Sequence, residues 1–273
     1  MSNPDPNTPV GVDPTRASVA RVYDALLGGK DNYEVDRQVM RELIEAMPDV
    51  ADAAKENRAF LIRVARFLAG QAGVAQFLDC GSGLPTAENT HQVVQRLNPE
   101  AKVAYVDNDP VVLAHGRALL EEDERTRLVE ADMFDPKSVL ENGIVRQHLD
   151  FSQPIGLLAL SVLHNYKGPR ERPAEVMREY IDALPSGSYV AISHILDPEA
   201  DDTEGRKAIE EALASGSLRG ATFRTRAEIM EFFPGLELLD PGLELVANWW
   251  PDGRLGPLNN AQKIYAGAVA RKP

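Results

Sequence analysis

Hydrophobic positions along this chain fall into short runs separated by longer stretches of mixed polarity. The runs at 77–79, 102–107 and 127–132 predict buried strands. The stretches that follow the first two runs, at about 86–97 and 110–121, predict helices. A repeated order of strand, helix and strand favours a parallel sheet with right-handed crossovers.

The same order continues to the end of the chain. Strands are expected at 155–161 and 188–194, and helices at about 171–184 and 203–215. The last third predicts a helix in TRAEIMEFF, a strand or a hairpin in LELLDPGLELV and a final alternating strand in QKIYAGAVARK. This ending predicts an antiparallel pair of strands at the end of the chain.

Three helices are expected before any strand. The first is capped by Thr15 or Ser18 and ends at the Gly28-Gly29 pair, and the others cover about 35–47 and 52–71. Helices placed this way can form a cap over the mouth of the α/β core. The predicted division is a flexible tail at 1–14, a helical cap at 15–72 and a core at 73–273.

Composition narrows the possible partners. The chain has 273 residues, 44% of them hydrophobic, which is enough for one α/β domain with an added cap. Its net charge of −13 argues against nucleic-acid binding, which generally needs a basic surface. The lone Cys80 excludes an internal disulfide, and the longest apolar run, 155–163, is too short to span a bilayer. We therefore expect a cytoplasmic protein without membrane or nucleic-acid partners, whose oligomeric state is left open.

The stretch AQFLDCGSGLPT carries the strongest chemical signal. A strand runs into a turn in which Gly81 and Gly83 allow positive φ and a close approach of the backbone to a ligand. Pro85 and Thr86 suit the first turn of the next helix. The dinucleotide fingerprint G-x-G-x-x-G is matched only in part, because Thr86 replaces the third glycine.

Acidic residues stand where the next strands end. Asp107 follows Gly83 by 24 residues, near the distance at which a carboxylate reaches a ribose. Asp132 and Met133, after the third strand, are candidates for adenine contacts or for plain turn roles. Asp109, before a proline, is better explained as a helix cap.

These motifs are similar to a known family. The segments DCGSG, YVDNDP, VEAD and ALSVLH match the order of sequence blocks in class I S-adenosylmethionine-dependent methyltransferases. The longer segments ARVYDALLGGKDNY, ENRAFLIRVARFLA, QFLDCGSGLPT, VDNDPVVLAH and LPSGSYVAISH resemble the actinobacterial S-adenosyl methyltransferase family. The resemblance implies a Rossmann-like sheet of seven strands with helices on both faces and an N-terminal helical cap.

The resemblance also implies that S-adenosyl-L-methionine is the cofactor. Asp79 and the carbonyl groups around Gly81 can face its ammonium group, and arginines of the cap suit its carboxylate. For Arg21 and Arg58, a surface salt bridge is the alternative. The cofactor-binding candidates are Asp79, Gly81, Ser82, Gly83, Asp107, Asn108, Asp132, Met133, Ser161, Arg21, Asn32, Tyr33 and Arg58.

Two histidines are the catalytic candidates. His164 follows the fourth strand, where the resembling enzymes place acceptor-side residues, and His194 ends the fifth. Either could deprotonate a hydroxyl or amine acceptor with an apparent pKa near 6.5, or simply support the scaffold. Trp249 and Trp250, with Tyr166, could line the acceptor pocket or pack into the core. No metal is expected, because the five histidines show no paired-ligand spacing.

The leading function is therefore an S-adenosylmethionine-dependent methyltransferase that acts on an unidentified small-molecule acceptor. A catalytically inactive protein that binds S-adenosylmethionine is one alternative. An NAD-dependent oxidoreductase is another, disfavoured because Thr86 replaces the third glycine and no Tyr-x-x-x-Lys motif is present.

Overall fold

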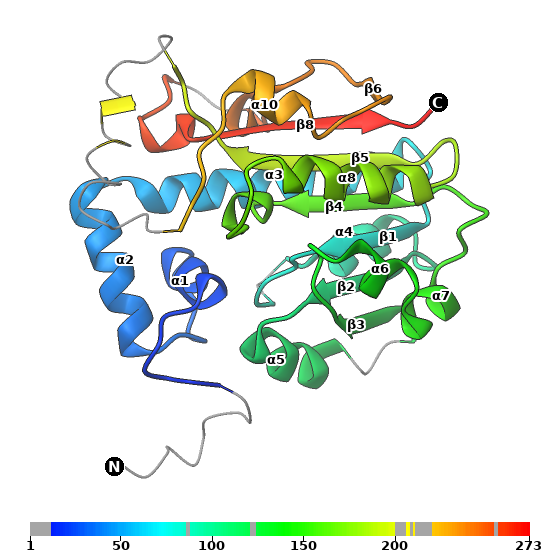
Figure 1. Cartoon of the computed structure of the whole chain (residues 1–273), viewed down its shortest axis with the longest axis horizontal. Helices are drawn as coiled ribbons and strands as arrows, with labels where there is room; N and C mark the ends of the chain where they lie inside the picture. The colour runs from blue at the N-terminus through cyan, green and yellow to red at the C-terminus, as the bar shows by residue number, and fades with distance from the viewer. Residues whose placement is uncertain are drawn as a thin grey trace.

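A single mixed β-sheet organises the chain (Figure 1). The computed structural model describes residues 12–85, 88–120, 124–199, 206–207, 210, 220–253 and 256–273. Five strands are parallel: β1 (Gln76–Cys80), β2 (Lys102–Asp107), β3 (Thr126–Glu130), β4 (Gly156–Leu160) and β5 (Tyr189–Ile195).

The far edge of the sheet is antiparallel. Strand β8 (Tyr265–Arg271) pairs with β5, and two short strands, β6 (Glu237–Leu238) and β7 (Glu244–Leu245), pair with β8 in turn. The order β3-β2-β1-β4-β5-β8-β6 has seven positions. Strand β7 shares the last position with β6, because both pair with β8, at different residues along it. The predicted seven-stranded, mostly parallel sheet is confirmed, and its strand order reverses beside β1, where open α/β sheets bind their ligands.

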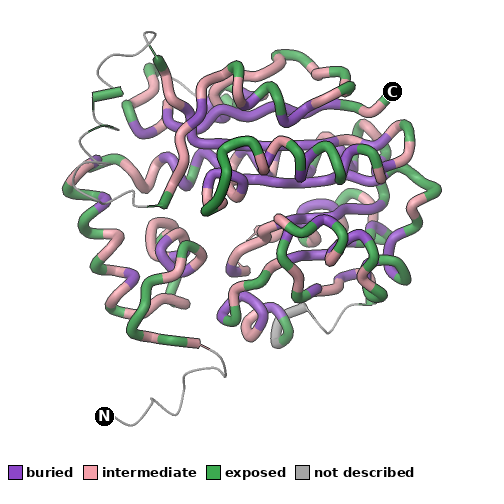
Figure 2. Tube along the Cα trace, in the orientation of Figure 1, coloured by how far each residue is buried: buried purple, intermediate pink, exposed green. Residues whose placement is uncertain are grey.

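Helices cover both faces of the sheet, as predicted (Figure 1). One face packs against α3 (Val50–Gly70) and α4 (Thr90–Leu97). The other packs against α6 (Pro136–Leu140), α7 (Gly143–His148), α8 (Arg172–Ala183) and α10 (Arg226–Met230). Helix α5 (Pro110–Leu120) packs beside β3. Figure 2 shows the central strands almost wholly buried, so the sheet forms the middle layer of three.

The core fixes the register of the central strands. All five residues of β1 and of β4 are buried, and Phe77 of β1 pairs with Gly156 of β4. A Cβ atom at Gly156 would lie 2.9 Å from the Phe77 ring, so the two strands approach closely only with glycine there.

Helices α1 (Val19–Leu26) and α2 (Glu34–Ala46) lie beyond the ends of the parallel strands (Figure 1). The N-cap of α1 is Ser18, one of the two predicted. Helix α3, in contrast, packs along the sheet as a core helix does. The proposed boundary between cap and core at residue 72 remains a prediction.

Three predictions about secondary structure need correction. Helix α4 begins at Thr90 rather than at 86, because Asn89 and Gln92 form a reciprocal cap there. The segment 236–246 forms two short strands against β8 instead of one strand or a hairpin. Helices α6 and α7 were not predicted, since five or six residues show no helical periodicity. Thr86 and most of the predicted helix at 203–215 lie outside the described residues.

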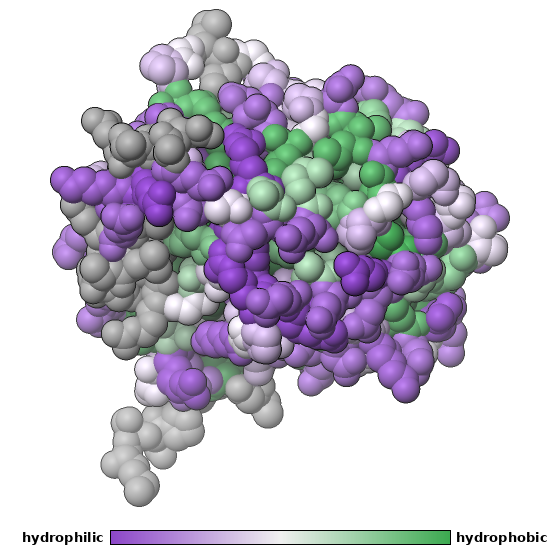
Figure 3. Space-filling model, turned by 45° about the horizontal axis from the view of Figure 1, so that its top comes forward, coloured by the Kyte–Doolittle hydropathy of each residue, from purple (hydrophilic) through white to green (hydrophobic). Residues whose placement is uncertain are grey.

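The surface carries isolated apolar side chains. Hydrophilic residues cover much of the face in Figure 3, with smaller apolar areas between them. Among the described residues, the large apolar side chains that are exposed come from five different helices and are Val19, Ile44, Leu97, Ile144 and Met230. None of the described helices has the length and hydropathy to cross a membrane. A cytoplasmic location remains a prediction.

We predict that Gly156→Ala lowers the free energy of unfolding by about 1 to 3 kcal/mol, because the new methyl group overpacks the contact with Phe77. Chemical denaturation measures the change. Gly143→Ala is the matched control, since a Cβ there meets nothing within 4 Å and Gly143 begins helix α7. Equal stability of Gly156→Ala and the wild type would contradict the packing argument.

Candidate functional site

The glycine turn after β1 brings three strand ends together. Gly81 and Gly83 have φ angles of 71° and 68°. The amide of Gly81 donates to the Val106 carbonyl at 2.8 Å, at the end of β2. A Cβ at Gly81 would lie 2.3 Å from Cγ2 of Val162, which follows β4. Glycine is therefore required where the turn passes between β2 and the segment after β4.

Asp107 lies at the end of β2 and holds the turn in place. Its Oδ2 accepts a hydrogen bond from the Gly83 amide at 2.9 Å, and its Oδ1 accepts one from the Asp109 amide at 2.9 Å. Burial raises the pKa of this carboxyl. Each oxygen has a second lone pair, so the carboxylate can still accept hydrogen bonds from a ligand. Asn108, the next residue, is exposed at the same edge.

Asp79 is a buried carboxylate at the end of β1. It accepts a hydrogen bond from Thr90 Oγ1 at 2.6 Å, and burial raises its pKa to about 6. The charge of Arg58 counteracts part of this rise, whereas that of Asp107 adds to it. A buried acid perturbed in this way at a strand end is a candidate for ligand binding.

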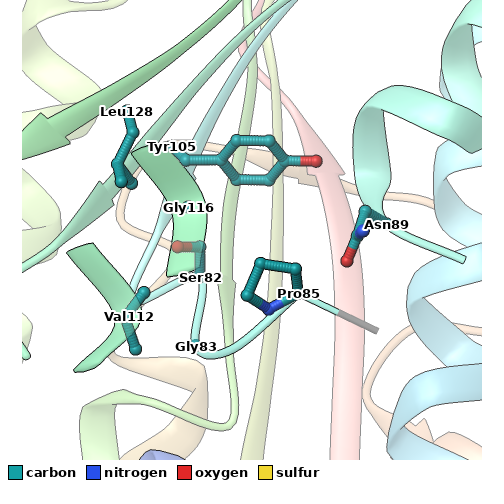
Figure 4. A pocket seen from close by; sticks show the side chains of 8 residues that line it. All are labelled: Ser82, Gly83, Pro85, Asn89, Tyr105, Val112, Gly116 and Leu128. Carbon is teal, nitrogen blue, oxygen red and sulfur yellow. The ribbon is translucent and has the colours of Figure 1, made fainter. Parts of the chain in front are cut away.

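A small open cleft lies between the glycine turn and α5 (Figure 4). The Tyr105 side chain projects across it with the hydroxyl toward Asn89, and that hydroxyl accepts a hydrogen bond from the His91 amide at 2.8 Å. The cleft lining is Ser82, Gly83, Pro85, Asn89, Tyr105, Val112, Gly116 and Leu128.

Asp132 and Met133 follow β3, one strand beyond Asp107. Asp132 is exposed, and its Oδ1 accepts a hydrogen bond from the Phe134 amide at 2.9 Å, which is a turn interaction. Met133 is buried, and its carbonyl accepts a hydrogen bond from Tyr180 at 3.1 Å. Both residues lie at the same sheet edge as Asp107, and their predicted adenine contacts remain predictions.

Ser161 and His164 follow β4 on the other side of the glycine turn. Ser161 has a φ of 57°, an unfavourable region for a serine, and its Oγ shares a hydrogen bond with the Tyr265 hydroxyl at 2.7 Å. His164 is 6% exposed, and its Nδ1 has no hydrogen-bond partner among the described residues. Burial lowers the pKa of His164 to about 3. This histidine is therefore neutral at physiological pH.

His194 is fully buried in β5, and both of its ring nitrogens are occupied. Nδ1 lies 2.7 Å from the Ile195 carbonyl and must donate to it, so Nε2, 3.0 Å from Nη1 of Arg224, accepts. Burial holds the pKa of His194 well below its usual value. This geometry favours a scaffold role for His194 over the predicted role as a base.

Three of the predicted cap residues hold the cap together. Nε of Arg21 lies 2.9 Å from the Asp36 carboxylate, and both side chains are buried. The Arg21 guanidinium also lies over the Tyr33 ring, 5.0 Å from its centroid. Asn32 donates to Asp24 at 2.8 Å. In this arrangement these residues bind one another, so their predicted contact with a ligand carboxylate remains a prediction.

Arg58, on α3, contacts the chain just after the glycine turn. Its Nη2 bonds to the Glu88 carbonyl and lies 3.4 Å from Asn89 Oδ1. Its charge also acts on Asp79. Arg58 is therefore the predicted arginine that the fold brings to the ends of β1 and β2.

Helix α1 is tied to the β2 end of the site. Ser18 Oγ donates to Asp109 Oδ2 at 2.6 Å. Asp109 Oδ1 accepts from the Val111 amide at 2.8 Å, which confirms its predicted role as a helix cap. Ala20 packs near Leu84 of the turn in a small apolar cluster. These contacts place α1 over the glycine turn.

Sequence reasoning missed several polar residues on the β4 and β5 side. Tyr23 of α1 accepts a hydrogen bond from Asn57 Nδ2 at 3.0 Å, and Asn57 Oδ1 accepts one from Ser193 of β5. Tyr265 and Arg224 contact the residues described above. These five residues come from five distant segments without a shared motif. The quoted block ARVYDALLGGKDNY contains Tyr23, but nothing in it marks that residue as polar lining.

Other candidate groups are structural. Trp249 is fully buried against Phe60, with ring centroids 5.6 Å apart, and donates from Nε1 to the Gly242 carbonyl at 2.9 Å, which confirms the core alternative for this residue. Cys80 is buried, and burial raises the pKa of its thiol. In the part of the chain that is described, no three His, Cys, Asp or Glu side chains are grouped to hold a metal.

The family model and the most similar solved structures that were found agree with one another. A family model described as S-adenosyl methyltransferase matches residues 6–273. A crystal structure from Thermobifida fusca YX, provisionally described as a methyltransferase, is 40% identical, with 98% of this chain and 99% of that chain covered and a TM-score of 0.89. A DUF574 family protein from Streptomyces avermitilis MA-4680 is 37% identical, with coverages of 94% and 98% and a TM-score of 0.85.

More distant similarity concerns the fold alone. The N-methyltransferase NodS from Bradyrhizobium japonicum WM9, solved with S-adenosyl-L-homocysteine, is 12% identical, with 87% of this chain and 97% of that chain covered and a TM-score of 0.51. No curated protein gives a significant match.

We predict that Asp79→Asn stabilises the ligand-free protein by about 1 to 3 kcal/mol near pH 7.5. Burial raises the pKa of Asp79 from 3.8 to about 6, and each unit corresponds to about 1.4 kcal/mol. The folded state thus holds this proton more tightly than the unfolded state, and the cost of the buried charge is complete only above about pH 6. The gain should shrink as the pH falls from about 6 to about 4.

Denaturant unfolding of both proteins near pH 7.5 and near pH 4 measures the effect. Asp150→Asn is the control, because Asp150 is exposed and hydrogen bonds from Ser152 lower its pKa, so its replacement should not stabilise. An Asp79→Asn protein that is no more stable than the wild type at either pH would show that the buried charge costs nothing.

Proposed function

The chain belongs to the S-adenosyl methyltransferase family and is an S-adenosylmethionine-dependent methyltransferase, and we propose that its methyl acceptor is a small molecule. The observation that carries this proposal is the burial of the residues beside β4 and β5. His164, His194 and Tyr265 are at most 9% exposed, and Tyr23 of α1 lies near them. Polar side chains buried in this way suit a compact ligand better than a macromolecular surface.

The residues at the ends of β1 and β2 fit the cofactor. Asp107 can accept hydrogen bonds from both ribose hydroxyls, with Asn108, Asp132 and Met133 on the adenine side. The backbone of Gly81, Ser82 and Gly83 is the proposed wall of this site, and the space beside Gly83 is open, since a Cβ there would meet nothing within 4 Å. When bound, the cofactor supplies a methyl group on a positively charged sulfur. The role of the protein is then to align the acceptor with that methyl group.

The methionine end fits the β1 side of the turn. Asp79 and the carbonyl groups near Gly81 are the proposed partners of the ammonium group, and the raised pKa of Asp79 means that this cation would favour its ionised form. Arg58 is the proposed partner of the carboxylate, because it lies beside the turn. Ser161 completes the proposed set on the β4 side. Arg21, Asn32 and Tyr33 would act indirectly, by holding the cap.

The segment from about 15 to 36, which contains α1 and only the start of α2, is the proposed lid. It contacts the turn and the β2 end through Ser18 and Ala20. Such a lid must open for the cofactor to enter and would exclude water once closed.

An activity assay tests the acceptor class. Purified protein and S-adenosylmethionine are incubated with pooled small molecules, with proteins or with RNA, and release of S-adenosylhomocysteine is measured. Turnover with small molecules supports the proposal. Turnover with protein or RNA alone overturns it. Titration calorimetry with S-adenosylmethionine and with NAD separates the two nucleotide alternatives, and nothing in the fold or the family favours NAD.

We predict that Asp107→Ala weakens S-adenosylmethionine binding tenfold or more. Hydrogen bonds to a charged group contribute roughly 1.5 to 3 kcal/mol each, and about 1.4 kcal/mol is a factor of ten. Asp107→Asn, which keeps one acceptor oxygen, should lose less. Calorimetry on proteins with verified thermal unfolding gives both affinities. Unchanged affinity in a folded Asp107→Ala protein would remove Asp107 from the ribose site.

We predict that S-adenosylmethionine slows hydrogen exchange of backbone amides in 15–36, because the lid closes on the bound cofactor. Ser18→Ala should raise exchange there in the free protein, since it removes the bond to Asp109. Amides of α8, which packs on the sheet, serve as the internal control. Identical exchange in 15–36 with and without the cofactor argues that this segment is not a lid.

A further inference from the structure

Arg224 is a buried cation that has only neutral hydrogen-bond partners. It is 3% exposed; its Nη1 lies 3.0 Å from His194 Nε2, and its Nη2 donates to the Arg170 carbonyl at 2.7 Å. Its guanidinium lies 5.4 Å from the centre of the Phe232 ring. Within the described ranges, no carboxylate forms an ion pair with it. A buried charge without a counter-ion is costly, so its presence calls for a compensating interaction.

His164 lies beside this cation with an unsatisfied nitrogen. Its ring meets the His194 ring edge to face, with centroids 5.4 Å apart and an interplanar angle of 84°. His164 Nδ1 is buried and has no partner in the described part of the chain. The Tyr265 ring lies 6.0 Å away on the other side. Among the described residues, the His164 nitrogen thus lacks a hydrogen-bond partner and the neighbouring Arg224 lacks a counter-ion.

Other charged groups near this place largely cancel. Arg170 and Glu228 form an ion pair at 2.5 Å, outside the buried cluster. Glu171 and Glu231 act on Arg224 only as more distant charges. The phenols of Tyr23 and Tyr265 have raised pKa values because they are buried, so both stay neutral. Arg224 is therefore the one of these groups whose charge acts on His164, while the carboxylates lie farther out and are not paired with it.

We propose that the methyl acceptor binds here through an oxygen that is already negatively charged, as in a phenolate or a carboxylate, and that His164 donates a hydrogen bond to it from Nδ1. This inference rests on the proposed function. Val162 touches the glycine turn, so His164, two residues later, adjoins the proposed cofactor site. An oxyanion bound to His164 would be attracted by the charge of Arg224 and, when the cofactor is bound, also by the positive charge that the cofactor carries.

The charge balance of the transfer agrees with this assignment. The acceptor oxygen forms a bond to the methyl carbon while the carbon–sulfur bond breaks and its electron pair stays on sulfur. The negative charge on oxygen and the positive charge on sulfur disappear together. No proton has to be removed, so His164 need not act as a base.

This replaces the expectation of a histidine base that titrates near 6.5. Burial and, to a smaller extent, the charge of Arg224 together lower the pKa of His164 to about 3, which makes the imidazole a poor proton acceptor. A protonated amine acceptor is also disfavoured, because Arg224 would repel it and no carboxylate among the described residues forms an ion pair with Arg224.

The experiment uses 4-nitrophenol, whose ionised form absorbs visible light, with the full-length protein saturated with S-adenosylhomocysteine. We expect millimolar or tighter binding and a bound nitrophenol pKa at least about one unit below that of the free phenol, a tenfold preference for the anion. Benzoate should also bind in calorimetry, and benzylamine should not. An unshifted or raised phenol pKa, or no binding of either anion, overturns the proposal.

Variants separate a charge effect from a structural one. Arg224→Gln should abolish most of the phenol pKa shift, and Arg224→Lys should keep part of it. Arg63→Gln is the matched control, because Arg63 is also buried and also bonds to carbonyl groups, those of Val246 and Trp249; it should leave the shift intact. If Arg224→Gln unfolds the protein, His164→Gln and the Lys variant still decide.

Cofactor binding keeps the two proposals distinct. If S-adenosylhomocysteine fails to bind the wild type, the proposed function fails. If it binds with normal affinity and nitrophenol shows no shift, the oxyanion proposal alone fails. A shift that is the same in the wild type and in Arg224→Gln also contradicts the role assigned to Arg224.

Discussion

The close approach of the glycine turn to its neighbours is the constraint on which the site depends. The backbone at Gly81 passes against Val162 with no room for a Cβ atom and bonds to the Val106 carbonyl. The ends of β1, β2 and β4 are therefore held at one point. Asp79, Asp107 and the segment after β4 follow these ends, so their spacing is set by backbone packing rather than by flexible side chains.

Burial of charge without full compensation recurs around this point. Asp79 has one hydrogen bond from a side chain, and Arg224 has neutral partners only. By contrast, Arg21 in the cap is paired with Asp36, where the pair has a structural role. Uncompensated charges lower the stability of a free protein and increase its affinity for a ligand of opposite charge. Arg63 is also buried among carbonyl groups, so a buried charge indicates a ligand site only where an unpaired polar group lies beside it, as His164 Nδ1 does beside Arg224 among the described residues.

The features that could be predicted from the sequence are those that depend on residues close together in the chain. Parallel strands buried on both faces appear as short apolar runs, and a glycine turn between strand and helix follows from residues that adjoin in the chain. The acceptor side could not be predicted in this way, because Tyr23, Arg224 and Tyr265 come from α1, the approach to α10 and β8. Their proximity results from the strand order, in which β8 inserts beside β5.

The same reason explains why the histidines were difficult to assign. His164 and His194 both follow or end strands at the correct edge, and the sequence offers no way to choose between them. The structure separates them by their surroundings, because His194 uses one nitrogen on its own strand and the other on Arg224, whereas His164 keeps Nδ1 unpaired. Its low pKa then argues for donation to a ligand rather than removal of a proton. The role of a histidine at a strand end thus depends on which group, if any, binds its second ring nitrogen. That group comes from a distant part of the chain and is not visible in the local sequence.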